Sequence, residues 1–290
     1  MKLARYEVDG QVHLGSVEGQ GLTDLTGRFE PLGDDMKTLI RSWPDLRGGV
    51  EAATGRADHH LSDVRLLAPI TRPGKIWGLG LNYADHIAET GRQAPDFPTF
   101  FAMAQTSICG PGDPIDIPLV SDRVDYEAEL VFIVGRGGRH VPEGEAADRI
   151  FGYCCGNDVS VRDWQRRTGQ FSIGKSFDSH APLGPWIVTA DEIDPLALAI
   201  RCEVNGERRQ DSNTCHQIFK PAYQLAHLSQ AMTMEAGDVI FTGTPGGVGA
   251  AYDPPKYLRA GDVVRVEIEG LGCLENPVRA EPDHTAAQKS

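Results

Sequence analysis

The chain has 290 residues, of which 40% are hydrophobic and 24% are charged, a composition typical of a soluble globular protein. Its net charge of −13 argues against a nucleic acid or an anionic membrane as partner. No apolar run approaches the roughly 18 residues of a membrane-spanning helix, and six cysteines without a C-x-x-C pair or zinc-ligand spacing predict reduced thiols and a cytoplasmic location.

Residues 1–70 are predicted to form a small β-rich domain. Strands over residues 3–8 and 12–17 are joined by Asp9-Gly10, a dipeptide typical of a tight hairpin turn. A short helix is expected around residues 36–43. His59 and His60 are adjacent in the sequence, so their side chains point apart, and we do not expect this pair to bind a metal.

The main domain is expected over residues 71–280, followed by a polar tail at 281–290. It opens with a strand at 76–80 and a short helix at 84–90, on which His86 and Glu89 share a face. The Glu89 carboxylate could therefore orient the His86 imidazole as a general base. The residues themselves leave two alternatives open, a solvated surface pair or His86 as a metal ligand. Residues 91–118 are rich in proline and glycine and predict a long loop, a feature that often has a function.

The segment 125–134 is predicted to be a strand, on which side chains two residues apart share a face. Glu127 and Glu129 then lie on the face of Val131 and Ile133. Two adjacent carboxylates beside apolar residues destabilise a protein unless they are neutralised. A hard divalent cation such as Mg²⁺, Mn²⁺ or Ca²⁺ would neutralise them. A solvated strand face is the alternative, which this pattern alone does not exclude.

A short apolar strand from residue 151 is predicted to end at Gly156-Asn157, which places Asp158 at the N-cap of a following helix. Arg162 and Gln165, four and seven residues further on, would share its helix face. One interpretation makes Asp158 a helix cap and Arg162 its surface partner. The other makes Asp158 a third carboxylate ligand, with Arg162 and Gln165 directed at the molecule that the metal holds.

Further strands are expected at residues 197–204, 238–242 and 263–268, with one helix around 222–232. Irregularly spaced strands with few helices predict a mixed, mostly β fold rather than a doubly wound sheet. No G-x-G-x-x-G motif follows a predicted strand, which argues against a dinucleotide cofactor.

Four motifs in this order resemble the fumarylacetoacetate hydrolase family: Glu127-x-Glu129, Asn157-Asp158-Val-Ser-x-Arg162-Asp163-x-Gln165, Gly174-Lys175-Ser-Phe-Asp178 and Thr242-Gly-Thr244-Pro-x-Gly-Val-Gly249. The resemblance runs from about residue 72 to about residue 280. Residues 1–70 resemble the small N-terminal extension of the longer bacterial members. The resemblance implies a β-sandwich or β-roll catalytic domain with few helices, and a homodimer.

The resemblance also implies roles for individual residues. Glu127, Glu129 and Asp158 would bind Mg²⁺ or Mn²⁺. The substrate, a small anionic 2-oxo acid, would be surrounded by Arg162, Gln165, Lys175 and Thr244. His86 and Glu89 resemble a catalytic dyad on a segment that orders over bound substrate. Here that segment would be a lid at residues 82–106, with hinges at Gly78, Gly80 and Gly91.

The implied reaction is hydrolysis of a carbon–carbon bond in a 2,4-dioxo acid of the acylpyruvate or fumarylpyruvate type. His86 would activate water, and the cation and Lys175 would stabilise the departing pyruvate enolate. The same site could decarboxylate oxaloacetate, or act as an isomerase or lyase on an unsaturated 2-oxo acid. A catalytically silent, metal-binding dimer is a further alternative. His216-Gln217 and the insertion at 250–258 depart from the family's pattern where the substrate tail should lie.

Overall fold

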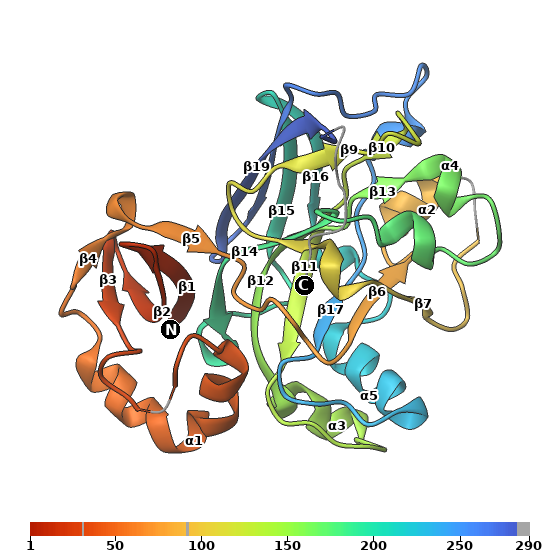
Figure 1. The fold of residues 1–290 in the computed structure, drawn as a ribbon. Helices are drawn as coiled ribbons and strands as arrows, with labels where there is room; N and C mark the ends of the chain where they lie inside the picture. The colour runs from red at the N-terminus through yellow and green to blue at the C-terminus, as the bar shows by residue number, and fades with distance from the viewer. Residues whose placement is uncertain (31, 91–92, 283–290) are drawn as a thin grey trace.

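A computed structural model describes residues 1–30, 32–90 and 93–282 (Figure 1). These residues form one long mixed sheet, a second sheet of five strands and a two-stranded pair, with few helices. The arrangement confirms the predicted mixed, mostly β fold. No helix in these ranges is long and apolar enough to cross a membrane. All six cysteines are free thiols, and the cytoplasmic location stays a prediction.

The N-terminal residues form the predicted antiparallel meander, drawn in red and orange in Figure 1. It consists of β1 (Lys2–Val8), β2 (Gln11–Glu18), β3 (Gly21–Asp24) and β4 (His59–His60). Asp9 and Gly10 take positive φ angles of 50° and 72°, as the tight turn between β1 and β2 requires. His59 and His60 are backbone partners of β3, with no metal-binding group around them among the described residues.

Helix α1 (Met36–Ala53) begins where predicted but continues ten residues beyond Trp43. Pro44 lies inside it, and the sequence suggested a helix end there because proline removes one backbone hydrogen bond. Leu39 and Val50, before and after this proline, are buried in the same hydrophobic cluster. Burial of this face on the meander therefore outweighs the local preference for ending the helix.

The main sheet continues from β1 through β14 (Ala181–Thr189), β12 (Ile150–Asn157), β11 (Ala128–Val134), β17 (Val239–Phe241), β6 (Ile76–Gly80) and β7 (Thr99–Ala102). Lys2 and Leu3 of β1 pair with Val188 and Ile187 of β14. The short strand β5 (Arg65–Leu67) pairs with β1. The sheet is therefore continuous between the two predicted domains, and their boundary near residue 70 stays a prediction.

The long loop predicted over residues 91–118 is wrong in part. It contains β7, β8 (Ile108–Cys109) and β9 (Ile115–Ile117), which pair with β6, β14 and β19 (Gly272–Ala280) respectively. Strands this short are stabilised by pairing with a partner strand more than by the preferences of their own residues. The prolines and glycines between them correctly predict turns, but the pairing partners lie elsewhere in the chain.

A second sheet packs on one face of the main sheet. Its strands follow the order β16 (Glu207–Asn213), β15 (Ala199–Val204), β18 (Val263–Ile268), β19 and β9. Leu130 and Phe132 of β11 are buried in a cluster with Val266 of β18, whereas Val131 and Ile133 are buried in the cluster that includes α1. This alternation confirms the predicted faces of the strand. Each fully buried side chain contributes about 1.5–3 kcal/mol, so β11 is held firmly on both faces.

Different helices lie at the two ends of the central strands of the main sheet (Figure 1). Helices α3 (Glu143–Ala146) and α5 (Pro221–Ala231) lie at one end, and α2 (Ala84–Thr90) and α4 (Arg162–Gln165) lie at the other. The pair β10 (Val124–Asp125) and β13 (Ser160–Val161) also belongs to the second end. Ala128 at the start of β11 pairs with Asn157 at the end of β12, so the predicted site residues that flank these strands meet there.

His180 gives the fold a pH-sensitive element. It is fully buried beside Phe177, and its Nε2 lies 2.8 Å from the carbonyl oxygen of Asp116. Burial lowers the pKa of His180 from 6.5 to about 4. Between these two pH values the unfolded chain binds a proton that the folded chain does not. Stability from the neutral imidazole is therefore complete above about pH 6.5 and is lost as the pH falls toward 4.

We expect this single residue to cost about 3 kcal/mol of unfolding free energy at pH 4 relative to pH 7.5. The measurement is urea denaturation of the wild type and of His180→Gln, which retains an N–H donor for Asp116. The destabilisation caused by the substitution should shrink by that amount at pH 4. If the free energies of unfolding of the two proteins changed equally with pH, the pKa of the imidazole would not be lowered by folding.

Candidate metal centre and active site

Three buried carboxylates meet where β11 begins and β12 ends. Glu127 directly precedes β11, Glu129 lies within it, and Asp158 directly follows β12. The backbone N–H of Asp158 donates to the Glu127 carbonyl at 2.9 Å, which fixes the two chain segments side by side. One oxygen from each carboxylate lies within 4.8 Å of the others. The structure thus brings together the three residues that the sequence proposed as metal ligands.

The predicted position of Asp158 at a helix N-cap is wrong. Asp158 lies in the link between β12 and β13, and α4 begins only at Arg162, after Val161. The intervening residues Ser160 and Val161 pair with β10, a contact that local sequence does not reveal. Arg162 and Gln165 both lie on α4, as predicted, whereas Asp158 directly follows the end of β12.

The charges of this cluster fit a divalent cation. Among the described residues, Asp125, Glu127, Glu129 and Asp158 are buried together with Arg162 and Lys175, so four carboxylates face two cations and two formal negative charges remain. One oxygen of Asp158, Oδ1, is buried and has no hydrogen-bond partner in the part of the chain that the structure describes. Hard oxygen donors with a surplus of two negative charges suit Mg²⁺ or Mn²⁺.

The pKa values of the carboxylates reflect the same surplus of negative charge. Although burial alone would raise the pKa of Glu127, Lys175 and Arg162 lower it to about 2. Burial raises the pKa of Asp158 to about 7 despite its contact with Lys175. Burial, together with the charges of Asp158 and Glu127, raises the pKa of Glu129 well above its usual range. Three carboxylates this close cannot all ionise at neutral pH without added positive charge.

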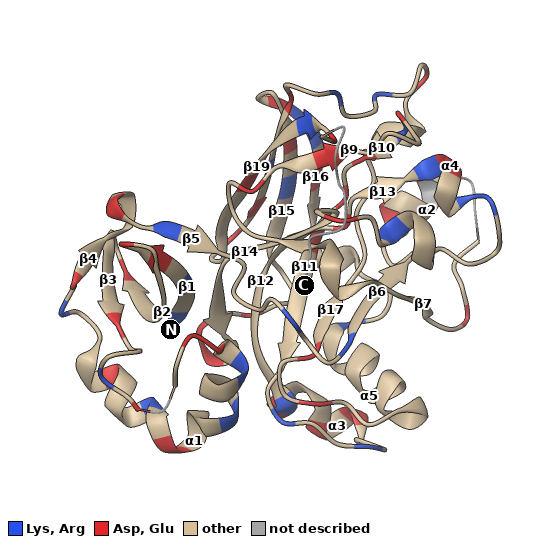
Figure 2. Ribbon diagram, in the orientation of Figure 1, with Lys and Arg blue, Asp and Glu red and all other residues tan. Residues whose placement is uncertain are grey.

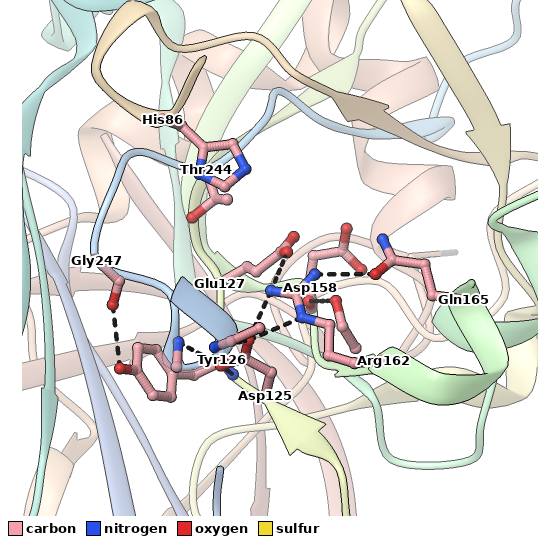
Figure 3. A network of polar contacts seen from close by, with 12 residues as sticks. His86, Asp125, Tyr126, Glu127, Asp158, Arg162, Gln165, Thr244 and Gly247 are labelled. Atoms are coloured by element: carbon pink, nitrogen blue, oxygen red, sulfur yellow. Dashed lines mark hydrogen bonds and ion pairs between the residues drawn. The ribbon is translucent and has the colours of Figure 1, made fainter. Parts of the chain in front are cut away.

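Lys175 and Arg162 contact the carboxylates directly. Lys175 Nζ lies 2.6 Å from both Glu127 Oε2 and Asp158 Oδ2. Arg162 Nη2 lies 2.7 Å from Glu127 Oε1 and 2.8 Å from Asp125 Oδ2. Arg162 Nη1 also donates to Gln165 Oε1 at 3.0 Å, as drawn in Figure 3. The predicted substrate residues are therefore linked to the carboxylate cluster.

Thr244 lies on the other side of β11. Its hydroxyl donates to the Ala128 carbonyl at 3.0 Å and accepts from Gln210 Nε2 at 2.8 Å. Gln210, which no sequence pattern marks, also accepts from the Ala128 backbone N–H at 2.9 Å. This buried glutamine fixes Thr244 against the first residue of β11.

The proposed dyad is present on α2. His86 Nδ1 lies 3.4 Å from Glu89 Oε2, and Glu89 Oε1 accepts from the Gly247 backbone N–H at 3.0 Å. His86 lines the same pocket as Glu127, and Figure 3 shows its ring above the carboxylates. The structure therefore brings the dyad to the carboxylate cluster.

Two of the three glycines expected as hinges are strand residues. Gly78 and Gly80 belong to β6, and a Cβ at Gly78 would overlap the Phe101 ring. Close packing therefore accounts for Gly78 without a hinge. Gly91 lies outside the described residues, and the lid at 82–106 stays a prediction.

A pocket of about 120 Å³ opens above the cluster. Its predicted members are His86, Glu127, Arg162, Gln165, Lys175 and Thr244. Its other walls include Leu79, Phe101, Phe171, Arg166 and Val248, which sequence reasoning missed because nothing in their spacing marks them. Ala250 and Ala251 of the insertion line the pocket, as the family pattern suggested. His216 does not line it, and its Nδ1 lies 3.1 Å from Ser212 Oγ.

Asp125 is a further residue that the sequence did not single out. It is completely buried and accepts hydrogen bonds from the backbone N–H groups of Gly249 at 2.7 Å and Ala250 at 2.9 Å. It also accepts from Arg162 Nε at 2.8 Å. Asp125 thus connects the loop that lines the pocket to the arginine that contacts Glu127 (Figure 3).

Comparison with known proteins agrees with this geometry. The model of the fumarylacetoacetate (FAA) hydrolase C-terminal domain matches residues 75–279, and an Rv2993c-like N-terminal domain model matches residues 1–69. The chain belongs to the fumarylacetoacetate hydrolase family. Members of this family are enzymes, among them hydrolases and isomerases.

Individual relatives cover nearly the whole chain. Oxaloacetate tautomerase fahd2 of Xenopus laevis is 43% identical over 266 residues, which span 90% of this chain and 83% of that protein. The fumarylacetoacetate hydrolase of Exiguobacterium antarcticum is 40% identical with a TM-score of 0.85, covering 97% of this chain and 100% of its own. Maleylpyruvate hydrolase of Sphingobium sp. SYK-6, solved with manganese(II) and pyruvate, is 32% identical with a TM-score of 0.82 and the same coverage.

We expect Glu129→Gln to weaken Mn²⁺ binding at least about a hundredfold, because it removes one charged ligand from the cluster. The glutamine can still accept the hydrogen bond from the Gly243 backbone N–H, so the fold should persist without metal. Calorimetric titration with Mn²⁺ and thermal melting of the metal-free protein measure the two effects. Glu207→Ala, on an exposed carboxylate of β16, is the control. Undiminished Mn²⁺ affinity in Glu129→Gln would show that the cation binds elsewhere.

Proposed function

We propose that this enzyme is a Mg²⁺- or Mn²⁺-dependent hydrolase that cleaves a carbon–carbon bond of a 2,4-dioxo acid. The observation that carries the proposal is that His86, paired with Glu89, lines one pocket with Glu127 of the buried carboxylate cluster. A silent metal-binding dimer would have no need of an oriented imidazole at this position. The manganese in the maleylpyruvate hydrolase structure supports the choice of cation.

Glu127, Glu129 and Asp158 would hold the cation, which when bound supplies positive charge opposite the negative charge that develops on the substrate. The Lys175 ammonium adds a second positive charge within the same cluster. Arg162, Gln165 and Thr244 line the pocket around it and would orient the substrate's polar groups.

His86 supplies the proton transfer. Its Nδ1 is directed at Glu89, so Nε2 is the nitrogen that would take a proton from water. The resulting hydroxide adds to the distal carbonyl carbon, C4, of the dioxo acid. The C3–C4 bond then breaks, its electron pair stays on C3, and protonation of C3 yields pyruvate and a carboxylic acid. Glu89 stabilises the imidazolium during this step, and Gly247 holds Glu89 in place.

Oxaloacetate tautomerisation is the second candidate, because oxaloacetate tautomerase fahd2 is 43% identical to this chain over most of its length. Moving a proton between carbon and oxygen of a 2-oxo acid needs the same base and the same charge stabilisation as hydrolysis. Decarboxylation of oxaloacetate and isomerase or lyase chemistry would also use them.

The deciding experiment follows products by NMR. The protein is incubated with acetopyruvate, maleylpyruvate, fumarylpyruvate or enol-oxaloacetate, with and without Mg²⁺. We expect Mg²⁺-dependent release of pyruvate from at least one dioxo acid. Keto–enol exchange of oxaloacetate with every dioxo acid intact would replace the hydrolase proposal by the tautomerase. Release of CO₂ would indicate a decarboxylase, and no reaction with any compound would favour the silent dimer.

His86→Ala should lower turnover of the dioxo acid at least about a hundredfold, the usual scale for loss of a general base. Mn²⁺ affinity should stay within about twofold, since His86 lies outside the carboxylate cluster. Glu89→Gln should be milder because the amide can still contact the ring. Steady-state rates and metal titration of the three proteins test this. Loss of metal from His86→Ala would make His86 a ligand, and normal turnover would assign water activation to another group.

We also propose a homodimer formed through the main domain. Leu119, Val120 and Ile173 are exposed by 65%, 57% and 61%, respectively, and burying this apolar surface in an interface would favour association. Among the described residues of 1–70, no large apolar side chain is exposed to this degree. Light scattering at micromolar concentration should give twice the 31.5 kDa mass of one chain. A mass near that of one chain would contradict the dimer.

A further inference from the structure

The cations that line the pocket differ in what they already contact. Lys175 contacts Glu127 and Asp158, and Arg162 contacts Glu127 and Asp125, all at 2.8 Å or less. Their charges are therefore largely neutralised within the carboxylate cluster. A second negative group on a substrate would need a cation that the protein has not paired.

Arg166 is such a cation. It follows the last residue of α4, lines the pocket and is exposed. Within residues 1–30, 32–90 and 93–282, no carboxylate lies within ion-pair distance of its guanidinium. Its neighbour Arg167 instead stacks over the Trp164 ring at 3.7 Å and lies 3.8 Å from Asp163. Of these two consecutive arginines, Arg166 lines the pocket, whereas Arg167 contacts two side chains of α4.

The pocket that Glu127 and Arg166 both line is small and partly apolar. Phe101 and Phe171 form an edge-to-face pair in its wall, with ring centroids 6.0 Å apart, and Val248 and Ala251 line it as well. Its volume of about 120 Å³ lies below the roughly 300–1,000 Å³ of pockets that hold drug-sized ligands, so it suits a small substrate.

We propose that Arg166 binds a second carboxylate, at the far end of the substrate, and so selects short dicarboxylic 2-oxo acids over those with neutral tails. This inference rests on the proposed function for the 2-oxo end, which the carboxylate cluster would receive through its cation. A planar guanidinium binds a carboxylate through two parallel hydrogen bonds, which a neutral tail cannot form. Basic residues lie on α4 and on the loop beside it, within a protein of net charge −13 (Figure 2). Such local positive charge is what draws an anion to an acidic protein.

Two ligands of equal length separate this role from general binding. The first is 2-oxoglutarate, and the second is 2-oxohexanoate, whose open chain has the same length but ends in a neutral methyl group. Calorimetric titration of each into the Mg²⁺-loaded wild type should show about tenfold to hundredfold tighter binding of the dicarboxylate. In Arg166→Gln this preference should fall to about twofold or less. Arg167→Gln is the matched control and should keep the wild-type preference, and thermal melting should show that all three proteins are folded.

Equal affinity of the wild type for the two ligands would overturn the assignment, as would an unchanged preference in Arg166→Gln. A preference lost in Arg167→Gln as well would assign the effect to the general positive potential of this loop, which also contradicts it. The ratio of affinities is measured without turnover. Failure of the protein to hydrolyse any dioxo acid would therefore refute the proposed reaction and leave the ratio as an independent result.

Discussion

The surplus of negative charge inside the protein is the constraint on which the site depends. Asp125, Glu127, Glu129 and Asp158 are buried, and Lys175 and Arg162 neutralise only part of their charge. Burying an ionised carboxylate without a partner is among the most costly changes a fold can make. The raised pKa of Glu129 and of Asp158 shows that the cation-free site avoids this cost by holding protons. A divalent cation would replace those protons, so metal binding and charge balance are one property of this cluster.

The rigid and the adjustable parts of the site have different origins. The carboxylates stand on β11 and β12, whose side chains are buried on both faces, so their positions are set by the cores. The dyad stands on α2 and reaches the loop after β17 through Glu89 and Gly247. Gly247 has a φ of 99°, and a Cβ there would overlap the Arg209 carbonyl, so this contact depends on glycine. This hydrogen bond links the position of α2 to that of the loop.

Sequence periodicity predicted the parts of the site that depend on one strand. The alternation through 125–134 placed Glu127 and Glu129 on one face, and the end of the next strand at Gly156-Asn157 was also predicted. It failed where the structure depends on partners distant in the chain. The pairing of β13 with β10 turned a predicted helix cap into a strand end, and β7, β8 and β9 appeared within a predicted loop for the same reason. Asp125 escaped notice because its contacts with Gly249 and Ala250 span more than a hundred residues.

The arginines of the segment after Asp158 show why a list of charged residues does not define a binding site. Arg162, Arg166 and Arg167 are the same residue type, and the family motifs include only the first of them. Arg162 contacts Asp125 and Glu127, and Arg167 contacts Trp164 and Asp163. Arg166 lines the pocket and has no carboxylate partner among the residues that the structure describes. An ion pair already made inside the protein contributes little to a ligand, whereas an unpaired guanidinium gains a charged hydrogen-bond partner when an anion binds. Specificity for the substrate tail should therefore follow the unpaired cation and not the most buried one.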